Sequence, residues 1–249
     1  MNEYGSLCTE WYEALYKYPP QEELELYSGY LLDDTQRVLE PMCGAGRFLI
    51  PMSAQGHAMY GFDHSAPMLE ICKAKLAQRG LRAQVMQASL SSFSYPMPFD
   101  MIFITSGSFG LIVDPHEALV SLKRIHAYLS DSGVFLVEIE TPLENQDALK
   151  VMHTMELTHN VQESLFLRKS ESYDVQSNIY TADLLFQKRI QGHLERSEAM
   201  KFVIKHYVSD EFEHLLKQAG FCAVKIVRRE HMELESTLST KSLIYECRK

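Results

Sequence analysis

The sequence lacks several features that would assign it to a specialised class of protein. No apolar run approaches the ~20 residues that a bilayer crossing needs, and residues 1–11 have neither the basic nor the apolar region of a signal peptide. The five cysteines are odd in number and form no C-x-x-C pair, which argues against a disulfide framework or zinc site and predicts a cytoplasmic location with reduced thiols. The ten histidines include no H-E-x-x-H motif, so no metal site is predicted.

Positive charge is also scarce. Lysine and arginine total 24 against 33 aspartates and glutamates, which gives a net charge of -9. This balance does not favour a nonspecific nucleic-acid binder, which needs a basic surface, although a local basic patch is compatible with it. With 249 residues, 46% of them hydrophobic, the chain is long enough for a substantial core in one large domain or two small ones.

Strand-like and helix-like segments alternate over residues 36–140. Short apolar strands are expected at 37–40, 57–62, 83–87, 100–105 and 134–139, and helices between them at 47–55, 65–79 and 116–129. Ser65 is the expected N-cap of the second helix. The alternation predicts a doubly wound parallel sheet with helices on both faces, and ligands then bind beyond the carboxyl ends of its strands.

The segments on either side follow other rhythms. Helices are expected at 6–18 and 22–32, ahead of the first strand. Residues 151–207 show strand-like alternation, clearest at 178–186 and 200–205, and predict a small antiparallel sheet. A helix capped by Ser209 should cover 209–218, followed by an antiparallel pair of strands at 223–227 and 243–246.

A glycine-rich turn between the first strand and the next helix is the most informative motif. Residues 40–47 read Glu-Pro-Met-Cys-Gly-Ala-Gly-Arg, and Asp63 ends the second strand. Glycines let the backbone approach a ligand closely, and a carboxylate at the end of the second strand can accept both hydroxyls of a ribose. The pattern therefore predicts a nucleotide-like cofactor.

Two kinds of cofactor compete for this turn. A dinucleotide site would have a third glycine where Leu49 stands, and Glu40 would repel its pyrophosphate. A carboxylate at that place suits a cation instead. S-adenosylmethionine (SAM) carries a sulfonium, an ammonium and a ribose but no phosphate, so Glu40 could face its aminoacyl end and Asp63 its ribose.

The same residues resemble the class I SAM-dependent methyltransferases, in particular those that act on small molecules. Residues 38–47 and 61–69 are similar to the acid–glycine turn and the acid-x-Ser-x-x-Met-Leu segment of that family, and 99–104, 129–135 and 212–221 are similar to its later motifs. The resemblance implies a Rossmann-like, seven-stranded, mostly parallel sheet. It departs from the family where Ser89 replaces the usual acid beside the adenine and where Asp131-Ser132-Gly133 replaces a Pro-Gly turn.

The resemblance also implies site residues. SAM contacts are expected from Tyr12, Glu40, Cys43, Gly44, Gly46, Arg47, Asp63, His64, Met68, Ser89, Leu90, Thr105 and Ser106. Substrate contacts are expected from Tyr16, Ser108 and Phe109. Tyr12 lies on the N-terminal helix that folds over the cofactor in related enzymes, and its hydroxyl could reach the carboxylate of SAM.

Methyl transfer from SAM needs mainly proximity and orientation, and a base only where the nucleophile must lose a proton. Glu138 and Glu140 fall on one face of a strand, so either could bind an amine or act as base, although solvated carboxylates are the simpler interpretation. Glu140 and His206 are the catalytic candidates. Residues 106–110 also approach the G-x-S-x-G motif of hydrolases, with Ser106 in place of the first glycine.

The sequence therefore predicts one SAM-dependent methyltransferase domain over 1–249. Residues 1–35 form a helical flap, 36–148 and 208–249 the core, and 149–207 an antiparallel lid inserted after the fifth strand, which can also serve as a homodimer interface. The expected acceptor is an N or O nucleophile of a small molecule, with no membrane or nucleic-acid partner. The alternatives are an RNA or protein methyltransferase and a SAM-binding regulator without transfer activity.

Overall fold

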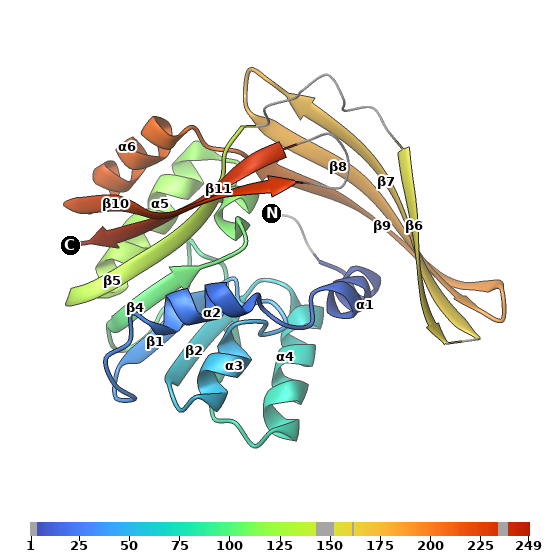
Figure 1. Ribbon diagram of the computed structural model, residues 1–249, viewed down its shortest axis with the longest axis horizontal. Coiled ribbons are helices and arrows are strands. Elements are labelled where there is room, and N and C mark those ends of the chain that lie inside the picture. Colours follow the sequence, from blue (N-terminus) through green and yellow to red (C-terminus); the bar gives the residue numbers. More distant parts are fainter. Residues whose placement is uncertain (1–3, 143–151, 161, 234–238) are drawn as a thin grey trace.

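The computed structural model describes residues 4–142, 152–160, 162–233 and 239–249. Two β-sheets dominate it: a larger sheet wrapped by helices, and a four-stranded sheet that projects from it (Figure 1). The boundary between core and lid expected at 148/149 falls outside the described residues. In the described part, no helix is both long and apolar enough to cross a membrane.

The larger sheet has seven strands in the order β10-β11-β5-β4-β1-β2-β3. All neighbours are parallel except β11, which runs antiparallel to both β10 and β5. The predicted mostly parallel seven-stranded sheet and its terminal antiparallel pair are confirmed. The strands are β1 (Arg37–Pro41), β2 (Ala58–Asp63), β3 (Gln84–Gln87), β4 (Phe99–Ile104), β5 (Leu129–Glu140), β10 (Ala223–Glu233) and β11 (Ser239–Arg248).

Helices cover both faces of this sheet, each over its own apolar cluster. On one face lie α2 (Gln21–Ser28), α3 (Leu49–Ala54) and α4 (Ala66–Gln78), and on the other α5 (Pro115–Tyr128) and α6 (Ser209–Ala219). The central strands are apolar on both faces because both are covered, as in other parallel sheets. The carboxyl ends of the parallel strands remain as the place where a ligand-binding site can form.

Of the two predicted helix N-caps, Ser65 is confirmed and Ser209 is wrong. Ser65 caps α4, and its hydroxyl accepts from the Met68 amide at 3.3 Å. The N-cap of α6 is Val208 and not Ser209, because the Ser209 hydroxyl pairs with the Tyr245 hydroxyl at 2.7 Å. A tertiary hydrogen bond to β11 has replaced the local cap.

The second sheet, sheet B, follows β5 in the chain, as predicted. Its strands β6 (Met152–Asn160), β7 (Glu163–Asp174), β8 (Ile179–Ile190) and β9 (His193–Lys205) form an antiparallel meander in that order. Its strands are longer than the predicted segments at 178–186 and 200–205. Leu165, Leu167 and Phe186 are buried on one face, here called the inner face, because they pack against the N-terminal helix.

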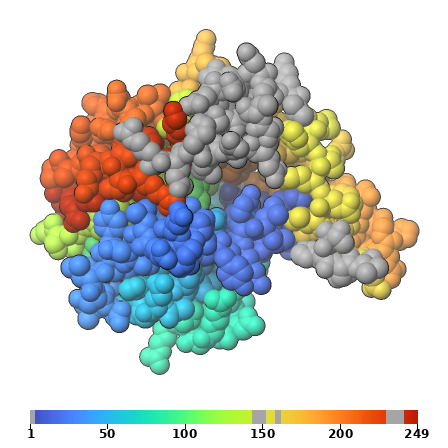
Figure 2. Space-filling model, viewed as in Figure 1, coloured from blue at the N-terminus to red at the C-terminus, as the bar shows by residue number. Residues whose placement is uncertain are grey.

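That helix, α1 (Ser6–Leu15), lies between the core and sheet B (Figure 2). Trp11 meets Phe186 of sheet B edge to face, with ring centroids 6.1 Å apart. The carboxylate of Glu198 on β9 accepts from the amides of Leu7 (3.1 Å) and Cys8 (3.3 Å), so sheet B supplies the cap that α1 lacks in its own sequence. The predicted flap is therefore fastened to the inserted sheet.

Candidate active site

The turn after β1 is shaped by two glycines with different surroundings. Gly44 has φ +51°, and a Cβ there would meet only the Met68 sulfur, at 3.9 Å. Gly46 has φ +81°, and a Cβ would come within 2.8 Å of both the Cys72 sulfur and a methyl of Ile50. Gly44 thus leaves room for a ligand, whereas Gly46 allows the turn to pack on α3 and α4.

Asp63 is placed at the end of β2 beside this turn. One carboxylate oxygen accepts from the Gly44 amide at 2.8 Å and the other from the Ser65 amide at 2.8 Å. Burial raises the pKa of Asp63, and these amide bonds oppose the rise. Each oxygen retains a free lone pair, so the carboxylate can still accept from the two hydroxyls of a ribose.

Glu40 is a buried carboxylate with an unsatisfied oxygen. It is only 3% exposed, and no group among the described residues hydrogen-bonds its Oε2. Burial raises its pKa well above the usual range, and the nearby Asp63 charge adds to the rise. A buried unpaired carboxylate is costly in the free protein, and a cationic ligand would offset that cost.

A cavity of about 130 Å³ opens in front of these residues. It brings together nine of the predicted site residues, which come from α1, β2, α4, the segments after β1, β2, β3 and β4, and a short 3-10 helix (Ser108–Leu111). They are Tyr12, Gly44, Asp63, His64, Met68, Ser89, Leu90, Ser106 and Ser108. The Ser89 hydroxyl stands where an acid was expected and already pairs with Ser92 (2.6 Å).

Of the predicted SAM and substrate contacts, seven do not line this cavity: Glu40, Cys43, Gly46, Arg47, Thr105, Tyr16 and Phe109. Two of them belong to the core. Cys43 is 4% exposed and packs behind the turn, and Phe109 is fully buried against Tyr207 and Phe212. Their burial gives them a packing role in the core.

Arg47 and Tyr16 form a separate group with Tyr12, which lines the cavity. The Arg47 guanidinium lies 5.6 Å from the Tyr16 ring centroid, and the rings of Tyr12 and Tyr16 are 5.2 Å apart. Burial raises the pKa of Tyr12, and the charge and hydrogen bond of Arg47 counter the rise. This group offers a cation and a hydroxyl to a ligand carboxylate.

Sequence reasoning missed five residues that line the cavity: Tyr4, Met42, Phe62, Ala88 and Leu111. Met42, a non-glycine residue at φ +58°, stood inside the motif and could have been included. Tyr4 carried no local signal, since it reaches the site only through the docking of α1. Burial raises its pKa well above the usual range, with further contributions from Cys8, Tyr12, Asp63 and Glu140.

The turn after β4 is held by a buried acid. Ser106 and Gly107 both have left-handed backbones, with φ of 56° and 62°. Glu138 on β5 accepts from the Ser106 amide at 2.6 Å and from the Ser242 hydroxyl. Burial raises the pKa of Glu138 while these bonds lower it. Glu138 therefore shapes the turn from behind, and it is Glu140 that remains available.

The two catalytic candidates meet in the structure. His206 Nε2 lies 3.3 Å from Glu140 Oε2, and His206 is 1% exposed. Glu140 packs on the backbone of Gly107, where a Cβ would come within 3.0 Å of its Cγ. The pair thus stands directly behind the turn whose residues Ser106 and Ser108 line the cavity.

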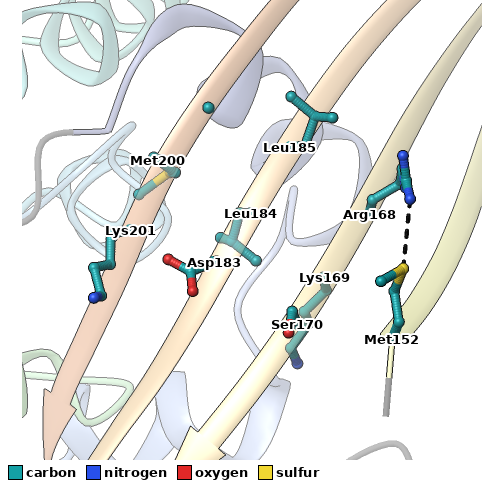
Figure 3. A pocket seen from close by; sticks show the side chains of 10 residues that line it. Met152, Arg168, Lys169, Ser170, Asp183, Leu184, Leu185, Met200 and Lys201 are labelled. Atoms are coloured by element: carbon teal, nitrogen blue, oxygen red, sulfur yellow. Dashed lines mark hydrogen bonds between the residues drawn. The ribbon is translucent and has the colours of Figure 1, made fainter. Parts of the chain in front are cut away.

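A larger hollow, of about 530 Å³, lies on sheet B (Figure 3). Its lining comes from all four strands, and Arg168 donates to the sulfur of Met152 across it at 3.5 Å. It contains none of the predicted site residues, and its carboxylate, Asp183, lies among Arg168, Lys169 and Lys201. The chemistry described above is therefore confined to the smaller cavity of the core.

Known proteins share this fold and part of this sequence. Residues 38–133 match the family model described as a methyltransferase domain. A protein of Geobacillus sp. (strain WCH70) that is named as a methyltransferase is 20% identical over 230 residues, covering 87% of this chain and 88% of its own.

Solved structures extend the likeness to sheet B. A SAM-dependent methyltransferase from Clostridium acetobutylicum ATCC 824 is 15% identical, with a TM-score of 0.72 over 96% of this chain and 97% of its own. The sugar N-methyltransferase KedS8 from Streptoalloteichus sp. ATCC 53650 is 14% identical, with a TM-score of 0.67 over 99% of this chain and 88% of its own. Residues 38–133 therefore match a methyltransferase domain, and the whole chain has the fold of SAM-dependent methyltransferases of known structure.

Proposed function

We propose that this enzyme transfers the methyl group of SAM to a nitrogen or oxygen nucleophile of a small molecule. The observation that carries the proposal is the pairing of Glu140 with His206 behind the turn that lines the cofactor cavity. This pair provides a proton acceptor where a nucleophile has to be activated. SAM, when bound, supplies a methyl group already activated by its sulfonium.

The proposed SAM contacts follow from opposite charges and from hydrogen-bonding atoms of the protein that still lack a partner or a second partner. Asp63 receives the ribose hydroxyls with its remaining lone pairs, and the unpaired Oε2 of Glu40 attracts the cationic aminoacyl end. Arg47 and Tyr12 receive the carboxylate of the same end. Ser89 and Leu90, which line the cavity, meet the adenine, and Gly44 lets the backbone come close. These residues would meet the ribose, the ammonium and the carboxylate of SAM.

Glu140 on β5 and His206, just after β9, act on the nucleophile. Glu140 takes the proton of an arriving ammonium or hydroxyl, and His206 holds the Glu140 carboxylate through its Nε2. Ser106 and Ser108 line the approach to the reacting atoms. Nitrogen is the favoured acceptor because a carboxylate attracts an ammonium, and KedS8, which has the same fold, is a sugar N-methyltransferase.

A small molecule is favoured over a polymer for two reasons. The net charge of -9 opposes an RNA substrate. The cavity is bounded by Tyr4 and Tyr12 from the N-terminal segment as well as by the core, so it suits an enclosed acceptor. Within the same proposal, residues 1–249 form one domain with sheet B as its lid, and two copies can associate through sheet B.

The test is calorimetric titration with SAM, followed by transfer of a labelled methyl group to three panels: small amines and hydroxyl compounds, RNA, and peptides. Binding of SAM and transfer to the first panel alone is the expected result. Absence of binding at millimolar SAM would refute the proposal, transfer to RNA or peptide would redirect it, and binding without any transfer would favour a regulator.

A further inference from the structure

A buried acid lies on the inner face of sheet B, away from the cofactor cavity. The side chain of Glu171 is only 7% exposed, and Lys169 lies 2.7 Å from its Oε1. His153 Nε2 is 3.7 Å from its other oxygen, and the Tyr180 hydroxyl donates to it. A buried carboxylate with several partners restrains the groups around it, because each lost contact leaves a buried polar group less well satisfied.

Tyr180 carries this anchoring to His206. Its ring lies parallel to the imidazole, at an interplanar angle of 5° with centroids 6.1 Å apart. Tyr173 flanks the imidazole as well, tilted by 41° at 5.6 Å. Tyr180 is 8% exposed, so the packing leaves its ring little freedom.

His206 itself is held at three points. Its backbone amide donates to the Asn178 carbonyl at 2.8 Å, its Nε2 faces Glu140, and one ring face meets Tyr180. Its buried Nδ1 has no hydrogen-bond partner among the described residues. Among the described residues, hydrogen bonding to Nδ1 therefore does not fix the ring, which leaves Glu140 and the flanking tyrosines Tyr173 and Tyr180 to hold it.

We propose that Tyr180 and Glu171 are positioning residues, which hold the His206 ring so that its Nε2 faces Glu140. The inference rests on the proposed function in assigning the pair to the reaction. The geometric part stands without that assignment: Glu171 fixes the Tyr180 hydroxyl, the fixed ring supports the imidazole, and the imidazole presents Nε2 to the carboxylate of Glu140. The inserted sheet thus contributes to catalysis without touching SAM.

The register of sheet B explains why these residues meet. Tyr180 on β8 pairs with Tyr173 on β7, and two residues further along each strand Ala182 pairs with Glu171. Alternate residues of a strand share a face, so Tyr180 lies on the same inner face as Phe186, and Glu171 on the same face as Leu167. His206 follows the end of β9 and continues that face toward the core.

The experiment measures the NMR chemical shifts of the imidazole nitrogens of His206. It uses the full chain, labelled with a nitrogen isotope at histidine and free of substrate. The His206 signals are assigned with His206→Asn. Glu140→Gln should shift the Nε2 signal in the wild-type background, because Nε2 faces that carboxylate. When Glu140→Gln is made in a Tyr180→Leu background, the Nε2 signal should move by roughly half as much as in the wild type, or less. Residues of one network lose their coupling when the contact that connects them is removed. Tyr180→Phe, which keeps the ring but not the hydroxyl, and Glu171→Gln should give intermediate values.

Thr181→Ala is the matched control, because the next residue of β8 points to the opposite face. It should leave the full shift in place. A full Glu140→Gln shift in both Tyr180→Leu and Tyr180→Phe would overturn the inference. If circular dichroism shows that Tyr180→Leu is unfolded, Tyr180→Phe decides the question. Failure of SAM to bind would refute the proposed function. It would not affect the inference that Tyr180 and Glu171 position the His206 ring.

Discussion

The cofactor edge of the core and the inner face of sheet B form their sites in opposite ways. At the core edge, Gly44, Asp63 and Ser65 come from adjacent turns and are joined by backbone amides. On sheet B, Glu171, Tyr180 and His206 are joined by side chains across three strands. A site joined through the backbone tolerates changes in surrounding side chains, whereas one joined through side chains depends on each contact. The match to the methyltransferase domain, residues 38–133, covers the first and ends before the second.

The largest effect is expected from Asp63→Ala. SAM affinity should fall about 100-fold, because a charge-assisted hydrogen bond contributes about 1.5–3 kcal/mol. Calorimetric titration with SAM measures it. Asp114→Ala is the matched control, since Asp114 accepts from the Glu117 amide at the start of α5 in the same way but lies outside the cavity. Equal affinities in the two variants would contradict the ribose role.

Gly46→Ala tests how rigid the turn is. Its Cβ would overlap Cys72 and Ile50, and the residue keeps a left-handed backbone, so the free energy of unfolding should fall by about 2–4 kcal/mol. Denaturant unfolding measures the change. Gly80→Ala has a similar φ of +64° with no atom within 4 Å, so it isolates the backbone strain of about 1 kcal/mol. Equal losses in both would show that the turn can relax.

Glu40→Gln should move stability and affinity in opposite directions. The raised pKa of Glu40 means that its contribution to stability is full below its ordinary value of 4.5 and is lost as pH rises through the folded value. At neutral pH the amide should therefore stabilise the free protein by about 1–3 kcal/mol while weakening SAM binding. Unfolding curves across pH and calorimetry measure the two effects.

Glu246→Gln is the control for that pH dependence, with the opposite sign. Its pKa is lowered despite partial burial, because Lys225, Tyr30 and Arg248 hydrogen-bond it. Its stabilising contribution is present above pH 4.5 and lost as pH falls, so the amide should destabilise at neutral pH. If both variants shifted stability in the same direction, the unpaired state of Glu40 would be refuted.

The smallest effect is expected at the contact that joins the two regions. Glu198→Gln removes the charge that faces the first amides of α1, which should cost about 0.5–1 kcal/mol and speed hydrogen exchange in that helix. SAM affinity should fall only slightly, because Tyr12 reaches the cavity from the same helix. Glu195→Gln, on the same strand but exposed, should change neither. Unchanged exchange in α1 would show that the cap is not needed.

Much of the core could be predicted from local pattern. The alternation of strands and helices, the Ser65 cap and the proline in the first turn of α3 each depend on neighbours a few residues away. Ser209 shows where that reasoning stops: its preference for a cap lost to a hydrogen bond with Tyr245, 36 residues away. The burial of Phe109 likewise depends on α6, whose Phe212 packs against it.

The sequence by itself therefore determined the parallel core, the glycine turn and the carboxylates of Glu40 and Asp63, because strand ends and tight turns are specified by consecutive residues. Only the tertiary structure decided that Tyr4 reaches the cavity and that Glu140 meets His206. Only it decided, too, that Tyr180 stacks on that imidazole. These contacts join residues through sheet register and helix docking, and register is fixed by the burial of a whole face, which no short segment encodes.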